Sequence, residues 1–133
     1  MIKHIVMWSV RGDDAAARGR NLALLKAEFE SLRGRIPGLL QLEVGVDESR
    51  IEYACDVVLY TVFASRQALL DYAEHPEHLR VRRTLGDMRS ARHQVDYEVQ
   101  EAAATVPCHA PLPAGTGAGT PQPGDTHHVQ AVR

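Results

Sequence analysis

The sequence is poor in cysteine, since its 133 residues contain only Cys55 and Cys108. One cysteine falls in a predicted strand and the other in a predicted tail, so the pair suits neither a disulfide framework nor a zinc site. We expect two free thiols and no metal centre. No cofactor-binding motif is recognisable either, so we expect no cofactor.

An excess of charge of one sign is also missing, because 15 Lys and Arg residues stand against 17 Asp and Glu residues. A nearly balanced charge provides no basic surface, so neither nucleic acid nor an anionic membrane is expected as a partner. The apolar stretch at 2–8 carries Lys3 and His4 and lacks a cleavage signature, which argues against a signal peptide and a membrane span. We therefore expect a cytoplasmic protein.

The composition changes near residue 101. Five of the seven prolines lie beyond this point, among small and polar residues. A segment of this composition buries too little apolar surface to fold. The glycine-rich run at 115–119 resembles a nucleotide-binding loop, but no predicted strand precedes it and no helix follows. We expect one domain over residues 1–100 and a disordered tail over 101–133.

The spacing of apolar residues predicts four strands and three helices. Alternation with a period of two predicts strands, and spacings of three and four predict helices. In the first strand, the alternation places His4, Val6 and Trp8 on one face. Pro76 disfavours helical geometry at His75, so one helix should end there and another begin. The predicted strands span 2–10, 39–46, 53–63 and 94–99, and the predicted helices span 14–32 and 65–74 and start again at 76.

This βαββαβ order is typical of the ferredoxin-like α+β fold, in which two crossover segments cover one face of a four-stranded antiparallel sheet. The first and third strands are apolar on both sides, so the open face should expose Val and Leu side chains together with Trp8. No further helix is available to cover this face, and the simplest cover is the same sheet of a second copy. We therefore predict a homodimer that forms an α+β barrel with room for a small hydrophobic ligand.

The segment from Tyr72 to His78 is the best candidate for a site, because it combines a phenol and two imidazoles with Pro76. In an unbroken helix Tyr72 and His78 would point to different sides, whereas a break at Pro76 lets them converge. His78 would lie in the first turn of the second helix, where unpaired N–H groups favour a neutral imidazole that can accept a proton. The segment predicts an acid–base pair. A structural alternative stays open, in which His75 and Pro76 turn the chain and Tyr72 belongs to a buried helix stripe.

A metal site is another alternative at this place. His75, Glu77 and His78, together with His4, offer nitrogen and oxygen ligands. Their spacing is loose, however, and His75 should point away from His78 across the helix start. The sequence therefore does not favour a metal ion here.

Six short segments resemble those of the stress-responsive A/B barrel (Dabb) domain family. They are MIKHIV at 1–6, IPG at 36–38, DVVLY at 56–60, FAS at 63–65, YAEHPEH at 72–78 and VDY at 95–97. The resemblance covers about residues 1–98, and its Tyr-x-x-His-Pro-x-His motif is fairly specific. It implies a dimeric ferredoxin-like barrel.

The resemblance also implies a reaction. One plant member of the family closes a linear polyketide by intramolecular aldol condensation without cofactor or metal. Its catalytic tyrosine and histidine look similar in placement to Tyr72 and His78, and a further histidine of its pocket matches His4. Its histidine on the third strand falls at Val57 here, beside Asp56, so we do not expect the same substrate.

Together, the residues and the resemblance predict a cofactor-independent enzyme of the polyketide cyclase or lyase type. His78 is the expected general base that removes a proton alpha to a carbonyl group, and Tyr72 orients or protonates the carbonyl oxygen of a small hydrophobic substrate. The expected substrate-binding residues are His4, Val57, Trp8 and His75. The alternative function is a non-catalytic stress-responsive barrel that binds a hydrophobic metabolite or a partner protein.

Overall fold

The computed structural model describes residues 1–100 of the chain. The predicted tail, with Cys108, lies outside the described residues. The elements follow the order β1 (Ile2–Val10), α1 (Ala15–Glu30), β2 (Leu39–Val46), β3 (Val57–Phe63), α2 (Arg66–Glu74), α3 (Pro76–Leu85) and β4 (Arg89–Glu98). The predicted order of strands and helices is confirmed. None of the helices in this part of the chain has the length and apolar character needed to cross a membrane.

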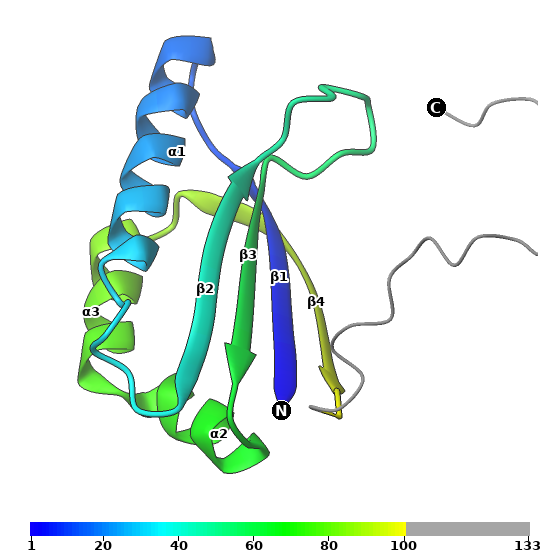
Figure 1. Cartoon of the computed structure of the whole chain (residues 1–133). Helices are drawn as coiled ribbons and strands as arrows, with labels where there is room; N and C mark the ends of the chain where they lie inside the picture. Colours follow the sequence, from blue (N-terminus) through cyan, green and yellow to red (C-terminus); the bar gives the residue numbers. More distant parts are fainter. Residues whose placement is uncertain (101–133) are drawn as a thin grey trace, which may run out of the picture.

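The four strands form one antiparallel sheet in the order β2-β3-β1-β4. Helices α1 and α3 lie side by side on one face of this sheet, and α2 lies at one end (Figure 1). The other face carries no helix from residues 1–100. This is the predicted ferredoxin-like α+β arrangement, and it creates two different environments, one between sheet and helices and one on the bare face.

The hydrophobic core lies between the sheet and the helices. Every second side chain of β1 points into it, and Trp8 stacks on Phe29 of α1 with ring centroids 5.3 Å apart. Trp8 is only 3% exposed, so the expectation that it lies on the open face is wrong. The reason is the period of the strand, because Trp8 shares its face with His4 and Val6.

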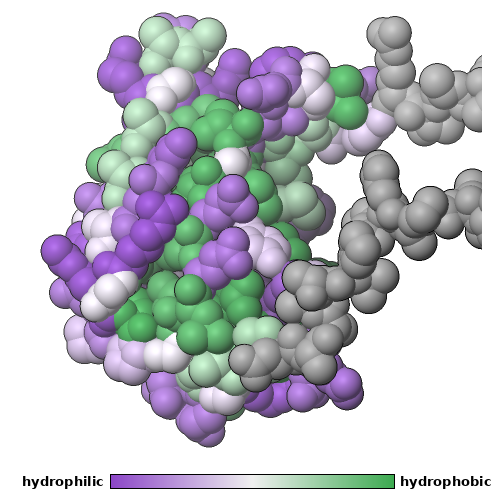
Figure 2. Space-filling view, in the orientation of Figure 1, coloured by the Kyte–Doolittle hydropathy of each residue, from purple (hydrophilic) through white to green (hydrophobic). Residues whose placement is uncertain are grey.

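The bare face of the sheet is apolar, as predicted. Its side chains come from the alternate positions of each strand, which point away from the helices. Among them, Met7 is 40% exposed, Val95 56% and Tyr97 43%. In the view of Figure 2, hydrophobic residues reach the surface over the strands, whereas the helices carry mostly polar residues. Exposed apolar side chains gathered on one sheet face are unusual on a monomer.

Three predicted boundaries differ from the structure by two residues or more. The first helix ends at Glu30 instead of residue 32, and β3 begins at Val57 instead of residue 53, which leaves Cys55 in the preceding loop. β4 begins at Arg89, five residues before the predicted start at 94. Arg89 and Arg92 pair with Val10 and Trp8 through the backbone, and backbone pairing is possible for polar residues that show no hydrophobic alternation.

A tight turn at Gly38 sets the position of α2. Gly38 has a φ angle of +78°, which side chains other than glycine rarely adopt. A Cβ atom there would lie 2.6 Å from the Cβ of Ala68 on α2. Glycine therefore permits the close contact that holds α2, and with it Tyr72, against the end of the sheet.

Candidate active site

Helices α2 and α3 meet at His75, which ends the first helix and caps the second. His75 has an extended backbone (φ −63°, ψ 136°), and its Nδ1 atom accepts a hydrogen bond from the Glu77 amide at 3.1 Å. Pro76 follows at the first position of α3, where the helix does not use a backbone N–H. The break brings the rings of Tyr72 and His78 to a centroid distance of 4.2 Å. The predicted convergence of these two side chains is confirmed.

Tyr72 and His78 line one cavity of about 170 Å³ between the sheet and the helices, and His4 of β1 lines it as well. The apolar part of its wall consists of Val6, Trp8, Phe29 and Leu59. Its charged part consists of Arg82, Arg89 and Arg92. The cavity therefore brings together four of the side chains that the sequence singles out, namely His4, Trp8, Tyr72 and His78.

The phenol of Tyr72 is buried and has no hydrogen-bond partner among the described residues. The side chain is 3% exposed, and its hydroxyl is the one buried side-chain polar atom of residues 1–100 that remains unpaired. Burial raises the pKa of Tyr72 well above its ordinary value, against the smaller opposite effect of the Arg92 and Arg89 charges. The hydroxyl therefore keeps its proton and can donate a hydrogen bond to a ligand in the cavity.

The imidazole of His78 is half-buried and neutral. Burial is the main cause that lowers the pKa of His78 below its ordinary value, and the charges of Arg82 and Arg89 lower it further. Its Nδ1 atom lies 3.0 Å from the carbonyl oxygen of Ala73. Because a carbonyl only accepts, Nδ1 carries the proton, and Nε2 keeps a lone pair that can take a proton from a substrate. The neutral state predicted for His78 is therefore favoured mainly by burial.

His4 is held by Asp96, which lies 92 positions away in the sequence. The Nδ1 atom of His4 donates a hydrogen bond to the Asp96 carboxylate at 2.6 Å, and the two residues face each other across β1 and β4. Asp96 is solvent-exposed on β4, yet its carboxylate is paired with the buried His4. The bond fixes the ring of His4 and leaves its Nε2 atom as the acceptor.

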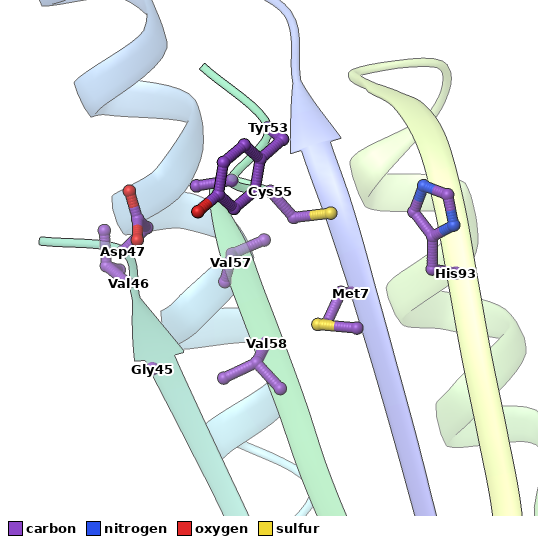
Figure 3. A pocket seen from close by; sticks show the side chains of 10 residues that line it. Met7, Gly45, Val46, Asp47, Tyr53, Cys55, Val57, Val58 and His93 are labelled. Carbon is purple, nitrogen blue, oxygen red and sulfur yellow. The ribbon is translucent and has the colours of Figure 1, made fainter. Parts of the chain in front are cut away.

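Val57 and His75 lie outside this cavity. His75 caps α3, and Val57 borders a second hollow of about 560 Å³ at one end of the sheet. Figure 3 shows this hollow on the bare face, where the side chains of Met7, Val58 and His93 lie on neighbouring strands with the helices behind. The structure thus separates Val57 and His75 from Tyr72 and His78.

Three arginines at the cavity, Arg82, Arg89 and Arg92, could not be singled out from the sequence. In the structure, Arg80 pairs with Glu28 at 2.7 Å and Glu77 at 3.1 Å, whereas Arg82 turns to the cavity and joins Arg89 and Arg92 of β4. No periodic signal marks these positions, because they meet only where α3 folds back onto the start of β4.

The described residues do not form a metal centre. Within residues 1–100, no group of three His, Cys, Asp or Glu side chains is placed to hold a metal ion. His75 uses its Nδ1 atom in the helix cap, and His4 uses its own in the bond to Asp96. The ligand set His4, His75, Glu77 and His78 is therefore not assembled.

Known structures share this fold. A dimeric protein of unknown function with a ferredoxin-like fold from Bacteroides fragilis is 28% identical, with a TM-score of 0.67 over 74% of this chain and 95% of that protein. A hydroxynitrile lyase from Passiflora edulis is 14% identical, with a TM-score of 0.63 over 75% and 94%. A Dabb family protein from Mesorhizobium loti is 20% identical, with a TM-score of 0.57 over 74% and 96%.

No curated protein matches the sequence. The family model of the stress responsive A/B barrel domain, by contrast, matches residues 2–99, which include each strand and helix of the described part of the chain and the residues that line the cavity. The match agrees with the resemblance carried by the Tyr-x-x-His-Pro-x-His motif and with the ferredoxin-like fold. The chain belongs to the stress responsive A/B barrel (Dabb) family.

Proposed function

We propose that the cavity between Tyr72 and His78 is the active site of a cofactor-independent enzyme of the polyketide cyclase or lyase type. One observation carries this proposal: a protonated, unpartnered phenol and an imidazole with a lowered pKa face the same cavity. A buried hydrogen-bond donor without a partner reduces stability, so its retention favours a role in binding a ligand. A hydroxynitrile lyase shares this fold, so the fold accommodates an enzyme of the lyase class.

In the proposed reaction, Nε2 of His78 takes a proton from a carbon alpha to a carbonyl group of the substrate. The electron pair of the C–H bond moves into an enolate, and the hydroxyl of Tyr72 donates a hydrogen bond to the enolate oxygen. The enolate carbon then forms a C–C bond to a second carbonyl carbon of the same molecule. The resulting alkoxide takes the proton back from His78, which restores the neutral imidazole.

The other cavity residues have binding roles in this proposal. Asp96 holds His4 so that its Nε2 atom can accept a hydrogen bond from a substrate hydroxyl or enol. Trp8 forms part of the apolar wall. The small volume of the cavity, compared with about 300–1,000 Å³ for pockets that hold drug-sized ligands, favours a small substrate.

We further propose that the protein is a homodimer in which the bare sheet faces of two copies meet. The exposed side chains of Met7, Val95 and Tyr97 support this arrangement, because a partner sheet would remove them from water. The Bacteroides fragilis protein, which is 28% identical, is described as dimeric. The cytoplasmic location expected from the sequence stays a prediction.

Replacement of the proposed base tests the reaction. We expect His78→Ala to lower kcat/KM for a linear poly-β-ketone by about 10²-fold or more, the usual contribution of a general base. His75→Asn is the matched control, because asparagine retains the capping acceptor and His75 lies outside the cavity. Turnover by His78→Ala at the wild-type rate would remove His78 from the catalytic role.

One contact favours the structural alternative. The bond from His78 to the Ala73 carbonyl ties the start of α3 to the end of α2, so His78 also stabilises the helix junction. In a purely structural role, His78→Ala would lower the free energy of unfolding and leave ligand binding in the folded protein unchanged. Unfolding and binding measurements on the same variant therefore separate the two functions.

A further inference from the structure

Three guanidinium groups converge on the cavity from two adjacent elements. Arg82 lies in the last turn of α3, and Arg89 and Arg92 lie in the first four residues of β4. All three line the same cavity as Tyr72 and His78. They also line, with Trp8, a shallower hollow directly beside it. The charged side of the cavity therefore extends to its opening.

These arginines have no acidic partner among the described residues. The arginines that form ion pairs within residues 1–100 are Arg11, Arg33, Arg35, Arg50 and Arg80. None of these pairs involves Arg82, Arg89 or Arg92, and Arg92 donates only to the neutral amide oxygen of Gln94. Arg80, on the same helix as Arg82, does pair with carboxylates, those of Glu28 and Glu77.

The three charges act on one another. Burial lowers the pKa of Arg89, and the charges of Arg92 and Arg82 lower it further. The guanidinium of Arg89 lies 5.2 Å from the centre of the Trp8 ring, which orients it but does not neutralise it. Arg82 and Arg92 are exposed, but their charges lie beside the half-buried Arg89 and disfavour its charged form, and a bound anion would offset this repulsion.

A second and independent feature points to a ligand at the same place. The Tyr72 hydroxyl, on a side chain that is 3% exposed, has no partner in the described chain and lines this cavity. The apolar part of the cavity wall includes Val6, Phe29 and Leu59. The cavity thus has a positively charged side, a neutral hydrogen-bond donor and a hydrophobic wall, which together suit a small amphipathic anion.

We propose that this cavity binds its ligand through an oxyanion, a carboxylate or a phosphate, that is held by Arg82, Arg89 and Arg92 while the apolar part of the ligand lies against the hydrophobic wall. Guanidinium groups bind both oxyanions through paired N–H donors. The inference rests on the proposed function in placing the ligand in the same cavity. It concerns binding alone, however, so it can be measured without turnover.

The single tryptophan of the chain provides the assay, because Trp8 lines the cavity beside Arg89. Benzoate, phenyl phosphate and benzamide are titrated into the full-length protein in a low-salt buffer without carboxylate or phosphate, and Trp fluorescence is recorded. Benzamide has the shape of benzoate without its charge. We expect at least one anion to bind about tenfold or more tightly than benzamide, and the tighter of the two identifies the oxyanion.

Charge-removing variants locate the effect. We expect Arg89→Gln to bind the anion no more than about threefold more tightly than benzamide. Arg20→Gln, on the exposed side of α1, is the control and should keep the wild-type ratio of the two affinities. Arg92→Gln, on an exposed edge position, serves as the second variant should Arg89→Gln fail to fold. Three results would overturn the proposal: the wild type binds both anions less than about tenfold more tightly than benzamide, it binds no anion up to about 10 mM, or the folded variant keeps the wild-type ratio of anion to benzamide affinity.

Failure of the oxyanion site can be distinguished from failure of the proposed reaction. His78→Ala leaves the three arginines in place, so it should retain the preference of benzoate or phenyl phosphate over benzamide even where turnover is lost. A wild-type protein that turns over a neutral poly-β-ketone but binds neither anion more tightly than benzamide would reject the oxyanion site and leave the role of His78 intact.

Discussion

The buried hydroxyl of Tyr72 yields a prediction in which stability and function change in opposite directions. Tyr72→Phe removes one oxygen atom and leaves the ring, which packs against Phe63 with centroids 5.0 Å apart and against His78 at 4.2 Å. The packing of the core is therefore retained. The variant loses only a polar group that has no hydrogen-bond partner among residues 1–100.

The expected magnitude follows from this lack of a partner. An unpaired buried hydroxyl costs about 1–3 kcal/mol. Because Tyr72 borders a cavity that can admit water, we expect the lower end, so Tyr72→Phe should raise the free energy of unfolding by about 1 kcal/mol. For a domain of this size, such a change raises Tm by about 4 °C. Turnover should fall about 10²-fold, since the donor to the enolate oxygen is lost.

Urea denaturation followed by circular dichroism measures the stability change, at one protomer concentration for all variants because a dimer would make stability concentration-dependent. Tyr53→Phe is the matched control, since Tyr53 is 65% exposed and should change the free energy of unfolding by less than about 0.5 kcal/mol. A loss of about 1 kcal/mol or more in Tyr72→Phe, with an unchanged m-value, would show that the hydroxyl is satisfied within the protein and would refute the reasoning.

Two further predictions concern protonation and assembly. Burial lowers the pKa of His78 in the folded protein, so the unfolded chain binds a proton first, and stability should fall as the pH drops below the ordinary histidine pKa of about 6.5. His78→Asn should reduce that dependence, and an identical pH profile of wild type and variant would contradict it. Val95→Lys places a charge on the bare sheet face and should shift the protein from dimer to monomer in sedimentation velocity, whereas Leu70→Glu on α2, a position that is 58% exposed, should not. A Val95→Lys dimer of wild-type affinity would exclude this face as the interface.

Much of the fold could be predicted because its signals are local. The alternation of β1 places His4, Val6 and Trp8 on one face, and the helix break at Pro76 is a property of the proline ring. The start of β4 could not be predicted in this way. Its residues from Arg89 onward pair with β1 through their backbone, and this pairing leaves no hydrophobic pattern in the side chains.

The candidate site, too, could be predicted only where its geometry is local. By itself, the sequence determined that Tyr72 and His78 can meet, because they are six positions apart across a break whose geometry is local. Only the tertiary structure decided that Asp96 holds His4, that Arg82 joins Arg89 and Arg92 around the cavity, and that Val57 lies elsewhere. These contacts depend on the register between β1 and β4 and on how α3 returns to the sheet. Strands pair through backbone groups that every residue except proline shares, so alternation in the sequence fixes the face of a side chain but does not by itself name its neighbour on the adjacent strand.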